Sequence, residues 1–423
     1  MHTYICSKCS ERYRASEIMY LCPVDDGVLD IDIDYLNIVR NGWRPERMSP
    51  ADMSIWRYSM LIPVSKPDFK SGIVGSVGGS PLVYADQLSK GLGEQVWIKN
   101  DSLLPTGSLK DRASAVVVSD AIARGRNVII AASTGNAGVA LAGMAAATGV
   151  KAVILAPAGA PAGKIAQIVA YGALLILVDG SYSDAYDLAS RASKEMNIYC
   201  RNTGYNPFTI EGKKTVAYEI CEQLSDHLVD GDHANYWKVP DIVVVPVGDG
   251  NMISGVYKGF VDLMAIGITS KIPKIVGVQA EGSAAIANAY NRGDEVVAEV
   301  RSQTIADSIS ADRPSDGYRA IKAVKGSDGE YFTVAEDEIR KSVLDVASMT
   351  GMFVEESSAV VYSGLRQLQN TERVKSGDNV VILITGHGLK TVDGSGVNRE
   401  MYSCVRPRLD ELGDVLMSKN IIV

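Results

Sequence analysis

One lysine stands where its amine could act as a nucleophile. Lys110 follows Gly107, which interrupts regular structure, and precedes the apolar run 113–118, which predicts a helix. Ser108 is expected to cap this helix, with Asp111 as its capping-box partner. Lys110 then lies in the first turn, where the positive end of the helix dipole disfavours an ammonium charge. A neutral amine can form a Schiff base with a carbonyl group, whereas most lysines at a helix start are only solvated.

A second segment, residues 133–138, has the composition of an anion site. Ser133, Thr134 and Asn136 stand among small residues, directly after an apolar run and before a helical stretch. Hydroxyls and free N–H groups at a helix start suit a carboxylate, and the amide of Asn136 suits a phenolate oxygen. A capped turn that binds no ligand explains the pattern equally well.

A third segment, residues 248–255, is rich in glycine and also follows an apolar run. Gly248 and Gly250 let the backbone approach a phosphate closely, and the N–H groups of the turn can hold it. The side chain of Asp249 is expected to point away from that phosphate. A dinucleotide-binding turn and an ordinary tight turn share this pattern, so the segment alone is a weak indication.

A fourth segment, residues 385–390, follows the last apolar run. Thr385 offers a hydroxyl that could face the nitrogen of an aromatic ring. His387 is one of four histidines in the chain, and we interpret it as an ordinary loop histidine rather than a catalytic base.

The N-terminus carries a separate cluster of metal-ligand residues. Cys6 and Cys9 form a C-x-x-C pair, and Cys22 and Asp25 stand where a zinc ribbon has its second pair of ligands. A site of three cysteines and one aspartate is uncommon. Two interpretations therefore remain: a ribbon that binds zinc, and a metal-free ribbon, which we favour.

The segments named above are positioned by alternating strands and helices. Apolar runs that predict strands occupy residues 96–99, 128–132, 152–156, 174–178, 242–247, 275–279 and 380–384. Helical patterns occupy residues 139–147, 184–195, 212–224 and 336–347. Continuous apolar strands separated by helices are typical of parallel strands buried on both faces. The predicted class is α/β with open twisted sheets, which bind ligands at the carboxyl ends of their strands.

Composition narrows the possible functions. The chain has 423 residues, 46% of them hydrophobic, and a net charge of −8 without a marked basic stretch, so a nucleic-acid partner is not expected. The N-terminus lacks a signal-peptide pattern, and the most apolar region, 128–162, is interrupted by proline and lysine, so no membrane span is expected. Six cysteines in so long a chain indicate a reducing compartment, the cytoplasm.

Five segments, taken in order, resemble the pyridoxal-phosphate enzymes of fold type II, and among these the threonine synthase family. The N-terminal ribbon pattern resembles that family too. The segments are T-G-S-L-K-D-R at 106–112, S-T-G-N at 133–136, N-P-F-T-I-E-G-K-K-T at 206–215, the loop 248–255 and T-G-H-G at 385–388. The resemblance implies conversion of O-phospho-L-homoserine and water to L-threonine and phosphate.

The resemblance also implies roles for particular residues. Lys110 is expected to hold pyridoxal phosphate as a Schiff base and Asn136 to bind its ring hydroxyl, while Thr385 meets the ring nitrogen. Ser133 and Thr134 are expected to bind the substrate's carboxylate or phosphate. The cofactor phosphate is expected on the backbone of Gly248, Asp249, Gly250, Asn251 and Met252.

A domain division follows from the same resemblance. Residues 76–112 and 211–400 are expected to form a large cofactor-binding domain, and residues 113–210 a small mobile domain. The ribbon-like module (1–33) and a helical arm (34–75) precede them, and a tail (401–423) of unassigned role follows. The family resemblance further implies a homodimer.

The chain departs from the family pattern at several positions. Leu109 replaces a phenylalanine, which is a packing change, and Asp25 replaces a ribbon cysteine. Thr209 stands where the family has an arginine suited to phosphate, and Lys213 stands where glutamine is usual. We expect Lys213 to supply the missing charge one helical turn further on.

Two alternatives remain open at this point. An enzyme of β-elimination or β-replacement on serine, threonine or a related amino acid would need no second phosphate site, and Thr209 favours it. A nucleotide-binding protein without catalytic activity would use loop 248–255 as a dinucleotide turn, but this leaves Lys110 and segment 133–138 unexplained.

Overall fold

The computed structural model describes residues 3–15, 20–43, 49, 51–133, 135–157, 162–228, 237–371 and 373–392. Thr134 and the predicted tail 401–423 lie outside the described residues. The helices are α1 (Tyr35–Arg40), α2 (Asp86–Leu92), α3 (Lys110–Ala123), α4 (Asn136–Thr148), α5 (Ala162–Ala170), α6 (Tyr182–Met196), α7 (Phe208–Lys213), α8 (Thr215–His227), α9 (Asn251–Ala265), α10 (Ala285–Arg292), α11 (Gly317–Gly326), α12 (Glu336–Thr350) and α13 (Glu356–Gln369).

The strands confirm the predicted α/β class. They are β1 (Thr3–Cys6), β2 (Arg12–Arg14), β3 (Leu29–Asp32), β4 (Leu82–Tyr84), β5 (Gln95–Asn100), β6 (Val128–Ala132), β7 (Lys151–Pro157), β8 (Leu174–Val178), β9 (Tyr199–Cys200), β10 (Ile242–Pro246), β11 (Lys274–Ala280), β12 (Glu330–Val334) and β13 (Asn379–Ile384). Six of the seven predicted apolar runs fall within one of these strands, and the seventh, 242–247, extends one residue beyond β10. The predicted helix 212–224 is two helices, because α7 ends at Lys213 and α8 begins at Thr215.

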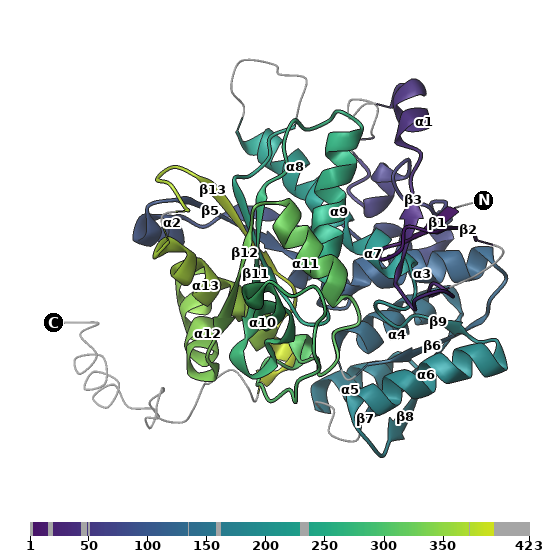
Figure 1. Ribbon diagram of the computed structural model, residues 1–423. Helices are drawn as coiled ribbons and strands as arrows, with labels where there is room; N and C mark the ends of the chain where they lie inside the picture. The colour runs from purple at the N-terminus through teal and green to yellow at the C-terminus, as the bar shows by residue number, and fades with distance from the viewer. Residues whose placement is uncertain are drawn as a thin grey trace, which may run out of the picture.

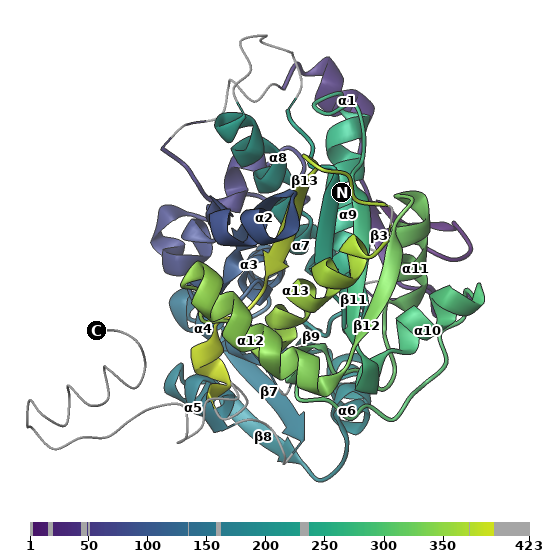
Figure 2. The ribbon, with the colours of Figure 1, turned by 90° about the vertical axis from the view of Figure 1, so that its left-hand side faces the viewer.

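Two larger sheets carry the strand-end segments (Figures 1 and 2). One has the order β12-β11-β10-β13-β5-β4 and is parallel except for β4, and the other has the order β8-β7-β6-β9 and is parallel throughout. A smaller antiparallel sheet, β2-β1-β3, contains the N-terminal cysteine segment. Among the described residues, no helix combines the length and the apolar character needed to cross a bilayer.

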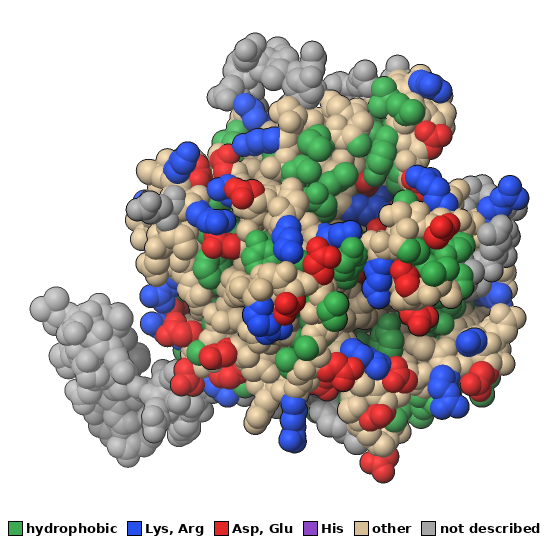
Figure 3. All heavy atoms as spheres, viewed as in Figure 1, with side chains coloured by type: hydrophobic (Ala, Val, Ile, Leu, Met, Phe, Trp, Pro, Cys, Tyr) green, Lys and Arg blue, Asp and Glu red, His purple; other side chains and the backbone are tan. Residues whose placement is uncertain are grey.

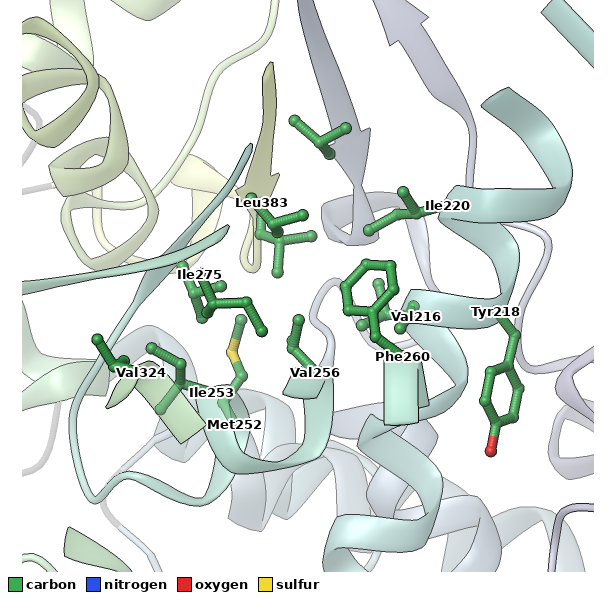
Figure 4. Packing of buried hydrophobic residues seen from close by; sticks show 14 of the residues in the cluster. Val216, Tyr218, Ile220, Met252, Ile253, Val256, Phe260, Ile275, Val324 and Leu383 are labelled. Atoms are coloured by element: carbon green, nitrogen blue, oxygen red, sulfur yellow. The ribbon is translucent and has the colours of Figure 1, made fainter. Parts of the chain in front are cut away.

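The six-stranded sheet is buried on both faces. Val243 and Val245 of β10 belong to a core cluster with α8, α9 and α11, and Val244 belongs to another cluster with α12 and α13. Figure 4 shows the first cluster, in which Phe260 of α9 packs near Val216 of α8. This double burial explains why the parallel strands are continuous apolar runs rather than alternating ones. On the surface shown in Figure 3, acidic and basic side chains are interspersed.

The predicted cap of α3 is wrong in detail. The helix begins at Lys110 as expected, but no side chain caps it, and the Oγ of Ser108 is buried without a hydrogen-bond partner among the described residues. Ser108 instead pairs through its backbone with Gly386. The carboxylate of Asp111 accepts hydrogen bonds from the N–H (2.7 Å) and the hydroxyl of Thr106. Asp111 therefore stabilises the preceding turn, and the hydroxyl of Ser108 remains without a hydrogen-bond partner among the described residues.

A buried ion network fixes α3 two residues after Lys110. The guanidinium of Arg112 donates to both carboxylate oxygens of Asp101 (2.7 and 2.8 Å) and of Glu219 (2.6 and 2.8 Å). Lys99 donates to the same carboxylate of Glu219 at 2.6 Å. All four side chains are almost fully buried. Burial alone raises the pKa of Glu219, but Arg112 and Lys99 outweigh it and lower that pKa to about 2.

We expect the substitution Glu219→Gln to lower the free energy of unfolding by about 3–5 kcal/mol at pH 7, because it leaves buried cations without their carboxylate. Glu219 has a depressed pKa in the folded state, so its contribution is present above its ordinary pKa of 4.5 and is lost as pH falls toward about 2. Urea unfolding followed by circular dichroism at several pH values measures both effects. The control is Glu195→Gln, in an exposed pair with Arg191, which we expect to change stability by less than about 0.5 kcal/mol. Equal midpoints for the two variants would contradict the assignment.

Candidate active site

The strand-end segments meet around one cavity of about 160 Å³. Its wall combines the start of α3, the end of β6 with the start of α4, and the ends of β10 and β13. Seven of the predicted site residues line it: Lys110, Ser133, Asn136, Gly248, Asp249, Met252 and Thr385. The structure thus brings together segments that are far apart in the sequence, as expected for the carboxyl ends of parallel strands.

Lys110 borders the cavity and is poised to be neutral. The loss of water around its amine lowers its pKa, an effect that the carboxylates of Asp249 and Glu355 oppose. The positive charges of Arg201 and Lys164 lower this pKa further. A lysine amine with a lowered pKa is a nucleophile and a proton acceptor, which is the chemistry expected from its position at a helix start.

Asn136 presents an acceptor to the cavity rather than a donor. Its Nδ2 donates to both oxygens of Glu355 (2.7 and 3.0 Å) and to Ser308 (3.1 Å). Its Oδ1 is buried and has no partner among the described residues. Because a carboxylate can only accept, Glu355 fixes this orientation of the amide. A ring hydroxyl that keeps its proton matches the free Oδ1, whereas the phenolate suggested by the sequence does not.

The glycine-rich segment 248–252 forms the turn between β10 and α9. Gly250 adopts a positive φ of 91°, and a Cβ added there would lie 2.7 Å from the carbonyl oxygen of Asp316. Asp249 lines the cavity, and its carboxylate turns back to accept the N–H of Asn251 at 3.1 Å. One of the N–H groups at the start of α9 is therefore already used. Gly250 and Asn251 are not among the residues that line the cavity.

Thr385 is held by Ser358 of α13, and Ser133 is held by the turn in which it lies. The hydroxyl of Thr385 is 3.0 Å from that of Ser358, which also accepts the N–H of Thr385 (3.0 Å) and of Gly386 (2.8 Å). Ser133 accepts the N–H of Gly135 at 3.1 Å. His387 accepts the N–H of Leu389 through its own Nδ1 at 3.2 Å, as an ordinary loop histidine does.

Lys213 and Thr209 meet at the start of α9, behind the cavity wall. Lys213 is 1% exposed, and its Nζ donates to the Oδ1 of Asn251 at 2.7 Å. The hydroxyl of Thr209 lies 3.4 Å from the same oxygen. Burial holds the pKa of Lys213 well below its usual range, and the charges of Lys110 and Arg201 add to that effect. Both side chains therefore reach the Oδ1 of Asn251. Lys213 can bring a charge to this point, whereas Thr209, one helical turn earlier, cannot.

Several residues of this site had no signal in the motifs. Arg201 follows β9, donates to Ser114 (3.3 Å) and to Thr203 (2.7 Å), and keeps a buried Nη2 without a partner among the described residues. Burial lowers the pKa of Arg201 to about 10. The fully buried Lys164 pairs with Asp307, which lines the cavity, at 2.8 Å. Arg201 and Lys164 stand outside any motif, so they can be recognised as site residues only when their burial in the structure is known.

The four N-terminal ligand residues also converge. One ligand atom from each of Cys6, Cys9, Cys22 and Asp25 lies within 4.8 Å of the others. The two sulfurs of Cys9 and Cys22 are 3.7 Å apart, and the sulfur of Cys6 is 3.3 Å from the Oδ1 of Asp25. These separations match the edges of a tetrahedron around an ion with metal–sulfur distances of about 2.3 Å.

Known proteins share both the sequence and the fold. A family model described as pyridoxal-phosphate dependent enzyme matches residues 73–386. The threonine synthase of Methanocaldococcus jannaschii is 37% identical over 394 residues, 92% of this chain and 93% of that protein. The threonine synthase of Methanosarcina acetivorans is 35% identical over 92% of both chains.

Solved structures agree at the level of the fold. A fungal L-serine ammonia-lyase from Rhizomucor miehei superposes with a TM-score of 0.64 and 23% identity over 77% of this chain and 98% of its own. Maize serine racemase superposes with a TM-score of 0.62 and 20% identity over 81% of this chain and 92% of its own. The sequence, the fold and the converging strand ends agree, and the chain belongs to the threonine synthase family of the fold type II pyridoxal-phosphate-dependent enzymes.

Proposed function

We propose that this enzyme converts O-phospho-L-homoserine and water to L-threonine and phosphate. The observation that carries the proposal is a group of three basic side chains, of which Lys110 lines the cavity and Lys213 and Arg201 are buried. Lys110, Lys213 and Arg201 all interact with the single carboxylate of Asp249. The amine of Lys110 reacts with the amino acid. Lys213 and Arg201 can supply positive charge to phosphate groups, which an unphosphorylated amino acid would not need.

The residues of the cavity fit pyridoxal phosphate. Lys110 supplies an amine with a lowered pKa, the turn before α9 supplies close backbone approach, and the free Oδ1 of Asn136 supplies an acceptor for a ring hydroxyl. Thr385, held by Ser358, supplies a hydroxyl for the ring nitrogen. When bound, the cofactor acts as an electron sink for the substrate carbon that carries the amine.

The chain's own residues supply proton transfer and binding. Lys110 Nζ, whose pKa is lowered by the loss of water around it, would take and return the proton of that carbon. Ser133 would bind the substrate's carboxylate or phosphate beside the start of α4, and the sequence assigns the same role to Thr134. Residues 113–210 would close on the larger domain and exclude competing water. Lys213, with the unpartnered Nη2 of Arg201 nearby, would bind the substrate's phosphate.

A second candidate keeps the cofactor and changes the substrate. β-Elimination or β-replacement on serine or threonine is favoured by Thr209, whose hydroxyl donates to the backbone carbonyl of Asn206 (2.8 Å) and brings no charge to the site. Phosphate release from O-phospho-L-homoserine, compared with ammonia release from serine and threonine, separates the two candidates.

We also propose that the enzyme is a cytoplasmic homodimer and that its N-terminal module binds zinc. Fold type II enzymes commonly form dimers, and the many free thiols suit a reducing compartment. Three sulfurs and one carboxylate oxygen that lie within 4.8 Å of one another support this proposal, because a structural zinc site uses four such ligands.

The first prediction concerns Lys110. Wild-type enzyme loaded with pyridoxal phosphate should be yellow, and borohydride should fix the cofactor on the peptide that contains Lys110. Lys110→Ala should lose both properties and release phosphate from O-phospho-L-homoserine at least about 1000-fold more slowly, because the amine both holds the cofactor and transfers the proton. The exposed Lys151→Ala is the control and should retain all three. A colourless wild-type protein that gains no absorption band with added cofactor would refute the proposal.

The second prediction concerns Lys213. Lys213→Gln should raise the KM for O-phospho-L-homoserine about tenfold or more, because a charge-assisted hydrogen bond to phosphate is lost, and should change kcat less. Steady-state kinetics of phosphate release measure both constants. Adding Thr209→Arg to this variant restores the family's arrangement of charge and should recover part of the KM. An unchanged KM in Lys213→Gln would show that this lysine does not bind the substrate.

The third prediction concerns the N-terminal cluster. Purified protein should contain a stoichiometric amount of zinc by plasma mass spectrometry, and Cys9→Ser should lower that content because it removes a thiolate ligand. Asp25→Cys should hold zinc more tightly against a chelator, since it completes a four-cysteine set. Cys221→Ala, a buried cysteine outside the cluster, is the control. Equal zinc content in wild type and Cys9→Ser would contradict the site.

A further inference from the structure

A continuous series of hydrogen bonds joins the N-terminal sheet to the turn before α9. Asp30 of β3 accepts from the Nη1 of Arg319 at 2.6 Å. Arg319 donates through Nε and Nη2 to the two oxygens of Asp316, at 2.6 and 2.7 Å. Asp316 in turn accepts from the Nδ2 of Asn251 at 3.0 Å. Three side chains therefore connect the module to the first residue of α9.

The series is buried over most of its length. Asp316 and Asn251 are each 1% exposed, and Arg319 is 8% exposed. Burial alone raises the pKa of Asp30, but Arg319 and Lys258 outweigh it and hold that pKa below its usual range, so Asp30 is ionised. The N–H of Asp316 also donates to the carbonyl of Asp249 at 2.9 Å. The arrangement of Asp316 thus fixes both the backbone of the turn and the side chain of Asn251.

The orientation of Asn251 decides what Lys213 meets. Because Asp316 takes the Nδ2 of Asn251, the Oδ1 is turned toward the Nζ of Lys213 at 2.7 Å. A rotated amide would present its NH2 to the lysine, and the charged form of Lys213 would then face another donor. The position of Lys213 therefore depends on the carboxylate of Asp316, and through Arg319 on Asp30.

A second branch ties the same carboxylate to the helix that carries Lys213. Lys258 of α9 lies 3.4 Å from the Oδ1 of Asp30 and donates to Glu211 of α7 at 2.6 Å. β3 lies beside α9 in the views of Figures 1 and 2. Asp30 therefore contacts two cations. Lys258 is bound to Glu211 of α7, the helix that carries Lys213. Arg319 is bound to Asp316, which holds the side chain of Asn251 at the start of α9.

The region between β3, α9 and α11 is held together by polar contacts, because it is not closely packed. A cavity of about 320 Å³ lies between β3 and the helices α9 and α11, lined by Asp30, Tyr257, Lys258 and Arg319 among others. Loss of an ion pair beside such a space is not compensated by apolar contacts.

We propose that Asp30 is a positioning residue for phosphate binding. The N-terminal module, through Asp30, Arg319 and Asp316, sets the orientation of Asn251 and thereby directs Lys213 toward a phosphate monoester. This inference rests on the proposed role of Lys213 in the site, and it assigns to the module a function in substrate binding that its distance from Lys110 does not suggest.

The test uses the cofactor-loaded enzyme with inorganic phosphate as the probe. Phosphate is titrated into wild type, Asp30→Asn and the control Asp32→Asn, and binding is followed by the visible absorption of the bound cofactor. Asp32 lies on the same strand and pairs with the exposed Arg12. Asp30→Asn should weaken phosphate binding about three- to tenfold, and Asp32→Asn should bind as wild type does. Thermal unfolding shows whether both variants fold.

A double-mutant cycle separates positioning from a merely structural role. Asp30→Asn should weaken phosphate binding much less when Lys213→Gln is already present, because both changes act on the same contact. Additive effects, or an Asp30→Asn variant that melts earlier but binds phosphate like Asp32→Asn, would overturn the inference, as would a wild-type enzyme that does not bind phosphate. A wild-type enzyme that binds phosphate yet releases none from O-phospho-L-homoserine would refute only the proposed function.

Discussion

The buried network around Arg112 is the constraint on which the site depends. Arg112 follows Lys110 by two residues, so the carboxylates of Asp101 and Glu219 fix the start of α3 between the end of β5 and α8. Partners from two elements hold one guanidinium, and each of its bonds restrains the helix that presents Lys110. A buried network of this kind contributes little net stability compared with apolar packing, yet losing one partner is costly, and its value therefore lies in defining one arrangement.

The second constraint is the contact between α3 and α7. A Cβ on Gly212 would lie 2.1 Å from the carbonyl oxygen of Arg112, so only glycine permits the two helices to approach this closely. The approach places Lys213, the next residue, at the start of α9. Two neighbouring residues of the same motif thus have linked roles. Gly212 allows α7 to approach α3, and Lys213 can then contact Asn251.

The sequence predicted the fold and the main binding segments because their patterns are local. Continuous apolar runs identify buried parallel strands. The strand β9 was not predicted because it has only two residues, and β12 was not predicted because partly buried and polar residues interrupt its apolar pattern. Likewise Lys110, Asn136 and Thr385 stand in recognisable turns. Arg201, Glu355 and Ser358 act through contacts made only in three dimensions. The cap at Ser108 was mispredicted because Thr106 competes for Asp111.

The distribution of charge in the site explains why a phosphorylated substrate is the better interpretation. One oxygen of Asp249 already accepts a hydrogen bond from the N–H of Asn251. This single carboxylate therefore cannot fully balance the positive charges of Lys110, Lys213 and Arg201. Without an anion, burial favours the neutral form of both lysines, and the pKa of each is lowered accordingly. The two have different needs when a ligand arrives. Lys110 must stay neutral to accept a proton, whereas Lys213 gains by becoming charged. A phosphate in contact with Lys213 acts most strongly on that lysine, and it therefore favours the ammonium form of Lys213 more than that of Lys110.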